Sequence, residues 1–504
     1  MTLAPTLMLQ GTSSHVGKST LVTALCRAFR QDGLRVAPFK AQNMALNSYV
    51  TADGREVGRA QASQAAAAGI DLSVDMNPIL LKPQSDRRSQ VIVLGRPLST
   101  MEAADYYREK VRLLPLVLDA LERLRRAYDL VIIEGAGSPA EINLRASDIV
   151  NMRIARETMS PVLLVGDINL GGVFAALVGT LALVRPEERD LVVGFLINKF
   201  RGDVELLRPG LTFLERYTNK KVYGVLPYLR DIGMAEEDSV ALDRPNERAT
   251  PNDSGADVAV IQLDHISNFD DIDALRQDAD LRVRFVRSLA ELGEPDAIVL
   301  PGTKSTVADL ERLRQSGLAR AIVQRRRTGA LIVGICGGYQ MLGTAIHDPH
   351  GVESSVTTIE GLGLLRVETT FVPRKATYRV DVVPASPHPA TAGLSRSGFA
   401  GYEVHMGQTT GPDATPPLLT LRRADGAELP DGAASPDGRV VGHYIHGCFD
   451  QIAGRAWFRS LVPHLHGSGS DVSLRDVREQ AYDRLAATVR ANTDWDAIRA
   501  LVGR

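Results

Sequence analysis

One cysteine lies between glycines at the end of an apolar run, an arrangement that can expose a nucleophile. Residues 331–335 are apolar, and Gly334, Cys336 and Gly338 follow a G-x-C-x-G spacing. Glycines permit the sharp strand-to-helix turn that lifts a nucleophile to the top of a sheet. The N–H groups and dipole of the following helix favour a thiolate there. The alternative is a core cysteine beside a tight turn, because free cysteine often packs as a small hydrophobe. We interpret Cys336 as a nucleophile.

A nucleophilic thiol needs a base and an oxyanion hole. Three histidines in the last third of the chain are candidate bases: His405, His443 and His446. Since residues 443 and 446 face opposite sides of a strand, only one of them can reach Cys336, and spacing alone does not choose. For the oxyanion hole we expect the N–H of Gly337 and a donor from the loop around Gly302, where the missing side chain allows close approach.

A second chemical signature near the N-terminus has the order of a phosphate-binding loop. An apolar strand runs into Gly11, and Gly17, Lys18, Ser19 and Thr20 open a helix. In such loops backbone N–H groups cradle phosphate, the lysine reaches the terminal phosphates and the serine hydroxyl binds Mg²⁺. Five residues separate the two glycines, one more than in G-x4-G-K-[ST]. The pattern therefore predicts ATP binding by a lengthened loop, similar to that of dethiobiotin synthetase.

Polar residues at the ends of other expected strands are further candidate ligands in the part of the chain that contains the phosphate loop. Glu134 ends an apolar strand and is placed to bind Mg²⁺, which prefers hard oxygen ligands beside phosphate. Asn198 follows another strand and could read the edge of a nucleotide base. Residues 40–48 and 166–172 are polar loops on the same expected ligand edge, and each could instead be a turn that caps the next helix. We expect substrate contacts from four side chains there: Lys40, Gln42, Asn43 and Asp167. Asp53 and Glu56 are weaker candidates for the metal.

The elements that must position these residues alternate along the chain. Apolar runs predict strands at 6–10, 35–39, 130–133, 162–165 and 192–197, with helices at 20–31, 60–68 and 106–127. Such alternation indicates a parallel, doubly wound sheet. A second series has strands at 258–262, 283–286, 297–300 and 331–335. After about residue 365 we expect short strands, loops at 384–397 and 411–438, and a terminal helix over 480–502.

Composition and the clusters of turn-forming residues limit which partners, compartment and domain boundaries the chain can have. The chain has 504 residues, a net charge of −2 and three cysteines, so we expect no nucleic-acid partner and a reducing cytoplasm. We also expect no signal peptide, because the first residues lead directly into a predicted strand, and no membrane-spanning segment, because no apolar run is long enough. A segment rich in Pro, Asn, Asp and Ser predicts a linker. The expected domains are residues 1–245 for ATP binding, a linker at 246–256, and a second domain at 257–504 that contains Cys336 and ends in a helix.

The motifs taken together carry a family resemblance over essentially the whole chain. In order they are GTSSHVGKS, KAQNMALNS, EGAGSPAEINL, GDINLGGVFA, NKFRGD, LPGTKST, GICGGYQMLG, GYEVHMG and HYIHG. This combination resembles the cobyric acid synthases, a family of glutamine-dependent amidotransferases of cobalamin synthesis. The resemblance implies a dethiobiotin-synthetase-like domain followed by a class I glutamine amidotransferase domain. It further implies that Cys336 is the glutaminase nucleophile and His446 its base.

One position departs from the class I pattern. A glutamate usually stands two residues beyond the histidine, and here that position is Cys448. Asp450 could substitute for it, or the site could work as a Cys–His dyad.

The resemblance implies a specific reaction and its partners. Glutamine, ATP with Mg²⁺ and a corrinoid are the expected small molecules, and the b, d, e and g carboxylates of adenosylcobyrinic acid a,c-diamide become amides. Three alternatives share parts of the pattern. They are a cobyrinic acid a,c-diamide synthase, a ParA/MinD-like ATPase switch, and a degenerate amidotransferase half that acts as a scaffold.

Overall fold

Six parallel strands form the sheet of the first half of the molecule. The computed structural model describes residues 3–85, 87–229, 255–465 and 473–503. The strand order is β12-β11-β10-β1-β9-β2. The strands are β1 (Thr6–Gly11), β2 (Val36–Phe39), β9 (Leu130–Glu134), β10 (Val162–Asp167), β11 (Val192–Phe200) and β12 (Lys221–Pro227). Their central residues are fully buried, because helices cover both faces of the sheet.

Helices and a small subdomain with its own two sheets surround this sheet within residues 3–229. The helices are α1 (Lys18–Gln31), α2 (Arg59–Ala68), α3 (Ala103–Glu109), α4 (Leu114–Ala127), α5 (Met152–Thr158), α6 (Val173–Leu183), α7 (Pro186–Arg189) and α8 (Val204–Thr218). A mixed sheet contains β3 (Gln42–Met44), β6 (Ile79–Pro83), β7 (Arg88–Val93) and β8 (Arg96–Glu102), and a hairpin pairs β4 (Ser48–Val50) with β5 (Glu56–Gly58).

The second half contains two further sheets. The first is β14-β13-β15-β16-β24-β23, parallel except at its β23 edge. Its strands are β13 (Ala256–Ile261), β14 (Leu281–Val286), β15 (Ala297–Leu300), β16 (Leu331–Ile335), β23 (Ala433–Ala434) and β24 (Val440–His443). Its helices are α9 (Leu289–Leu292), α10 (Thr306–Gln315), α11 (Leu318–Arg327), α12 (Gly337–Leu342) and α13 (Ile452–Leu461). The two parallel-sheet units confirm the α/β fold class that the alternation predicts.

The other sheet of this half is built around two long strands. It contains β17 (Ala345–His347), β18 (Thr358–Glu360), β19 (Glu368–Pro384), β20 (Phe399–Thr410), β21 (Leu419–Arg423), β22 (Glu428–Asp431) and β25 (Ile445–His446). The expectation of short strands after residue 365 is confirmed for β21, β22 and β25 but is wrong for β19 and β20, which have 17 and 12 residues. The predicted loop at 411–438 also contains β21, β22 and β23, because cross-strand pairing offsets its many turn residues.

Several predicted boundaries also differ from the observed ones. The helix expected over 106–127 is divided into α3, a 3₁₀ turn and α4. Pro115 lies in the first turn of α4, where its missing N–H costs no helical hydrogen bond. The polar loop expected at 40–48 contains β3, which pairs with β6. Of the predicted linker, residues 246–254 lie outside the described residues.

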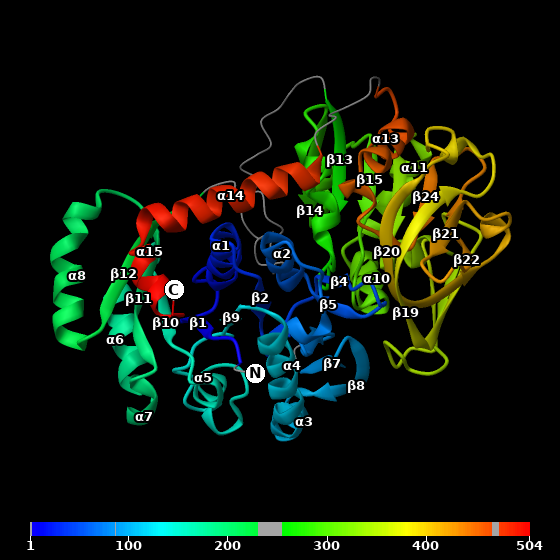
Figure 1. Ribbon diagram of the computed structural model, residues 1–504. Coiled ribbons are helices and arrows are strands. Elements are labelled where there is room, and N and C mark those ends of the chain that lie inside the picture. Colours follow the sequence, from blue (N-terminus) through cyan, green and yellow to red (C-terminus); the bar gives the residue numbers. More distant parts are fainter. Residues whose placement is uncertain (1–2, 86, 230–254, 466–472, 504) are drawn as a thin grey trace.

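The chain returns to its first half at the C-terminus. Figure 1 shows α14 (Leu474–Asn492) crossing from the second half to the first sheet, where α15 (Trp495–Ala500) follows. Leu485 and Val489 join the apolar cluster beneath α1. Arg27 of α1 pairs with Asp483 at 2.7 Å. The terminal helix, which the domain prediction assigns to the second half, thus packs on the first and is broken between residues 492 and 495. Among the described residues, no helix is long and apolar enough to cross a membrane.

This packing predicts that Leu485→Ala destabilises the first half. Leu485 is 3% exposed, so its truncation leaves a cavity and should lower the free energy of unfolding by about 2–5 kcal/mol. The matched control is Leu206→Ala, since Leu206 is 83% exposed on α8 and its loss should cost less than about 0.5 kcal/mol. Urea denaturation followed by circular dichroism measures both. Equal midpoints for the two variants would contradict the packing of α14.

Candidate active site

The backbone at Cys336 has the strained conformation of a nucleophile elbow. Cys336 connects β16 to α12 with φ 52° and ψ −107°, a region that residues with a side chain rarely adopt. Its N–H donates to the carbonyl of His443 at 2.8 Å. Gly338 lies so close to the Leu300 carbonyl that a Cβ would overlap it. Gly338 is therefore required by close packing, and the turn holds Cys336 at the carboxyl end of the sheet.

His446 interacts with both Asp271 and this cysteine. His446 Nδ1 is 2.7 Å from Asp271 Oδ2, and the Gly447 N–H donates to the other carboxylate oxygen at 2.7 Å. Burial alone would lower the pKa of His446, but the charge of Asp271, its hydrogen bond and the neighbouring Cys336 raise that pKa to about 10. The three side chains have the geometry of a nucleophile, a base and a group that orients the base.

The other two candidate histidines are held elsewhere. His405 contacts Glu403 Oε2 at 2.9 Å and the Gly407 carbonyl at 2.8 Å, and its ring stacks on Tyr444. His443 is completely buried, and burial lowers its pKa to about 3. Of the three, His446 is therefore the histidine whose geometry suits a base for Cys336.

The third triad position was missed at the sequence level. Asp450, the suggested substitute, forms an ion pair with Arg478 at 2.7 Å and contacts Arg59 at 3.8 Å. Cys448 is buried, which raises the pKa of its thiol well above the usual value. Asp271 lies 175 positions before His446, so no local motif connects the two. Its only sequence signal is its place after β13, at the carboxyl edge of a parallel sheet.

The proposed oxyanion loop lies against the elbow. A Cβ on Gly302 would approach His446 Cε1 to 2.9 Å, and one on Gly337 would approach the Thr303 nitrogen to 3.1 Å. The backbone at both glycines therefore comes close to the catalytic candidates. Their roles as donors stay predictions.

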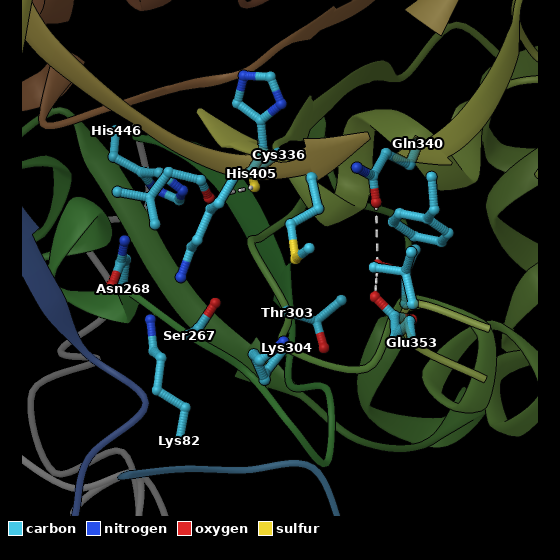
Figure 2. A pocket seen from close by; sticks show the side chains of 16 residues that line it. Lys82, Ser267, Asn268, Thr303, Lys304, Cys336, Gln340, Glu353, His405 and His446 are labelled. Atoms are coloured by element: carbon cyan, nitrogen blue, oxygen red, sulfur yellow. Dashed lines mark hydrogen bonds between the residues drawn. The ribbon is translucent and has the colours of Figure 1, made fainter. Parts of the chain in front are cut away.

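A cavity of about 560 Å³, its open mouth included, lies in front of Cys336. Figure 2 shows Cys336 and His446 on one side and Lys82 on another. Lys82 belongs to β6 of the first half, and its ammonium contacts Glu56 at 2.6 Å. Glu56 also pairs with Lys375 of β19, and these two lysines outweigh the effect of burial, so that the pKa of Glu56 lies below its usual range. Residues from both halves thus line one cavity.

The predicted phosphate loop connects β1 to α1. Gly17 has φ 97°, and the Lys18 ammonium is bonded to the carbonyls of Ser13 at 3.0 Å and Gly137 at 3.1 Å. Thr20 lies in the first turn of α1. A Cβ on Gly11 would approach the Lys18 ammonium to 2.7 Å, so a larger residue would displace the lysine. The Lys18 ammonium thus lies inside the loop at the N-terminus of α1, where a helix favours an anion.

Glu134 is the centre of the adjoining polar cluster. Its Oε1 accepts from Ser19 at 2.8 Å and pairs with Lys40 at 2.8 Å, and its Oε2 accepts from Gln64 at 2.6 Å. A hydroxyl and a carboxylate oxygen side by side are the hard donors that Mg²⁺ prefers beside phosphate, so Ser19 and Glu134 fit that ion. Gln64 of α2 was not anticipated.

The remaining predicted residues are distributed along the same edge. Asn198 donates to the Val16 carbonyl at 2.8 Å and so supports the phosphate loop. Asp167 pairs with Lys199 at 2.8 Å. Gln42 accepts from Tyr106 at 2.6 Å, and Asn43 donates to Gln61 at 3.1 Å.

The weaker metal candidates are not brought to Glu134. Asp53 pairs with Arg55 at 2.9 Å, and the oxygens of Glu56 are taken by Lys82 and Lys375. The suggestion that Asp53 and Glu56 join the metal is therefore wrong.

Comparisons with known proteins agree with both halves. Residues 7–241 match the CobQ/CobB/MinD/ParA nucleotide binding domain, and residues 257–453 match the CobB/CobQ-like glutamine amidotransferase domain. The protein is therefore a nucleotide-binding domain joined to a glutamine amidotransferase domain. Over 501 residues, 99% of each chain, it is 50% identical to a cobyric acid synthase of Dehalococcoides mccartyi strain CBDB1. It is 49% identical to that of Desulforamulus reducens, over 100% of this chain and 99% of the relative. The chain belongs to the cobyric acid synthase family, a family of enzymes.

The orienting contact predicts the behaviour of Asp271→Asn. Loss of the carboxylate charge should return the pKa of His446 from about 10 toward its ordinary value. The imidazolium then loses its proton at lower pH, so the alkaline limb of ammonia release from glutamine should move to lower pH. We expect kcat to fall by roughly 10²-fold. The measurement is a pH profile of ammonia release.

Asp450→Asn is the comparison variant, because Asp450 is bonded to Arg478 instead of His446. Its kcat and alkaline limb should stay near those of the unmodified enzyme. The assignment fails if Asp450→Asn, and not Asp271→Asn, shifts the limb.

Proposed function

We propose that the protein uses glutamine and ATP to amidate the b, d, e and g carboxylates of adenosylcobyrinic acid a,c-diamide, which gives adenosylcobyric acid. One observation carries this proposal. A Cys336–His446–Asp271 arrangement faces a cavity that is also lined by Lys82 from the nucleotide-binding half. Ammonia formed at this cysteine is therefore released toward the half that would activate the acceptor. The full-length identity to cobyric acid synthases supports the substrate.

Glutamine hydrolysis at Cys336 follows from the site geometry. The sulfur attacks the amide carbon, and backbone N–H groups near Gly337 and Gly302 stabilise the oxyanion. His446, held by Asp271, donates a proton to the leaving nitrogen, so ammonia departs and a thioester remains. Water activated by the same imidazole then releases glutamate.

Amidation of a carboxylate needs activation, because oxide is a poor leaving group. At the phosphate loop, the γ-phosphoryl group of ATP would pass to a carboxylate oxygen of the corrinoid, with Lys18 neutralising charge. Bound Mg²⁺, held by Ser19 and Glu134, would supply further charge neutralisation on the phosphates. Ammonia then attacks the acyl phosphate carbon and inorganic phosphate leaves.

The alternatives are weakened by different observations. A ParA/MinD-like switch has no use for the Cys336 elbow, and the family is one of enzymes. A degenerate amidotransferase half is disfavoured because an aspartate replaces the missing glutamate in contact with His446. The a,c-diamide synthase remains a chemical alternative, and product analysis separates it.

Cys336→Ala should separate the two half-reactions. With adenosylcobyrinic acid a,c-diamide, Mg-ATP and glutamine, the unmodified enzyme should give four successive acid-to-amide mass steps by mass spectrometry. Cys336→Ala should give none with glutamine and all four with ammonium salts, because only the nitrogen source is lost.

Lys18→Ala is the matched variant for the other half. It should lose amidation from either nitrogen source while ammonia release at Cys336 persists. Full activity of Lys18→Ala would contradict the assignment of the phosphate loop. Absence of any mass step with the unmodified enzyme would contradict the proposed substrate.

A further inference from the structure

The turn that carries Asp271 is held in place by residues of the nucleotide-binding half. Asp270 and Asp271 are neighbours in one 3₁₀ turn. Asp270 Oδ2 forms an ion pair with Arg59 Nε of α2 at 2.9 Å, and both side chains are at most 7% exposed. Asn268, which precedes the turn, accepts from the Ser48 N–H at 2.9 Å. Two contacts from the first half therefore fix the backbone that carries Asp271.

Arg59 also contacts the turn that follows His446. Its Nη2 is 3.8 Å from Asp450 Oδ2, and Asp450 in turn pairs with Arg478 of α14 at 2.7 Å. Asp450 ends the short 3₁₀ turn just after His446. One guanidinium from α2 thus contacts both the turn that orients the imidazole and the turn that follows it.

The titratable groups around the His446 imidazole come from several elements. Asp271 Oδ2 lies 2.7 Å from its Nδ1, and Cys336 interacts with the same ring. The ring of Tyr402 stacks on the imidazole with 5.5 Å between centroids, and buried His443 lies within reach of its charge. Burial lowers the pKa of His446, and the charge of Asp271 is the strongest influence that raises it. That pKa therefore reports how closely Asp271 is held.

We propose that Arg59 is a positioning residue for the glutaminase base, because its ion pair with Asp270 keeps the neighbouring carboxylate against the imidazole. This inference rests on the proposed glutaminase role of Cys336. Arg59 acts through the turn and contacts no reacting atom. Loss of the ion pair would free the turn at one of its two anchors, so Asp271 would spend less time in contact with His446.

Such positioning would make glutamine hydrolysis depend on the nucleotide-binding half. Gln64 on the same helix donates to the candidate metal ligand Glu134. Rigid secondary elements can carry coupling between sites, and α2 connects the base to the metal site in this way. Efficient release of ammonia would then be limited to chains whose two halves are docked.

The test is the double variant Arg59→Met with Asp270→Asn. Replacement of both partners avoids the cost of a buried charge without its ion pair, and it leaves the net charge near the imidazole unchanged. We expect kcat for ammonia release from glutamine to fall by roughly tenfold to 10²-fold with little change in KM, because the base is less often in position. The alkaline limb of the pH profile should move to lower pH, since the pKa of His446 falls from about 10.

A conservative variant and a matched pair complete the experiment. Arg59→Lys should keep most of kcat and the position of the alkaline limb, because a lysine ammonium lies one atom beyond the place of the arginine Nε. Arg284→Met with Asp257→Asn removes the same two charges from a partly buried pair at 2.7 Å. That pair includes the amino end of β13, away from the carboxyl edge that carries Cys336, so it should leave the limb in place.

The outcomes are distinct. A double variant at Arg59 and Asp270 whose kcat and alkaline limb match those of the control pair would overturn the proposal. An equal loss in Arg59→Lys would contradict it as well, since the charge is kept there. Amidation with ammonium salts should be normal in every variant, and an equal fall in that reaction would assign the loss to the fold as a whole and reject a positioning role. No ammonia release by the unmodified enzyme would instead overturn the glutaminase assignment.

Discussion

Buried charge pairs between the two halves fix the geometry on which both candidate sites depend. Arg59 of α2 pairs with Asp270 at 2.9 Å, and Glu56 of β5 pairs with Lys375 of β19. These four side chains are at most 7% exposed. Charges are expensive to bury, and removal of one partner from such a pair costs about 3–5 kcal/mol. The halves are therefore held in one relative position, and the cavity between them keeps its shape.

The same contacts bring the two sets of candidate residues into one structure. Asp270 is bonded to the nucleotide-binding half, and its neighbour Asp271 holds His446. Helix α2 begins at Arg59, and Gln64 on the same helix donates to Glu134 at 2.6 Å. One helix thus contacts both the turn that orients the base and the candidate metal ligand. The terminal helix α14 covers α1 and further ties the end of the chain to the first half.

Local patterns predicted much of this architecture, and long-range contacts account for what they missed. The strand–loop–helix order at Gly17 and at Cys336 is encoded within about a dozen residues, so both turns were predictable. Asp271 was not, because its function depends on a partner 175 positions away. The length of β19 and β20 was not predicted, because it depends on the pairing of these two strands with each other. Likewise, nothing in the sequence of α14 indicates that it packs on α1.

The central claim is that nitrogen passes from glutamine at Cys336 to the acceptor without leaving the protein. Amide-¹⁵N glutamine supplied together with an excess of unlabelled ammonium salt, Mg-ATP and adenosylcobyrinic acid a,c-diamide tests it directly. Mass spectrometry of the corrinoid reads the isotope content of the new amides. The structure predicts that these amides carry mostly ¹⁵N. An isotope content equal to that of the mixed ammonia pool would contradict a shared cavity as the source of the nitrogen.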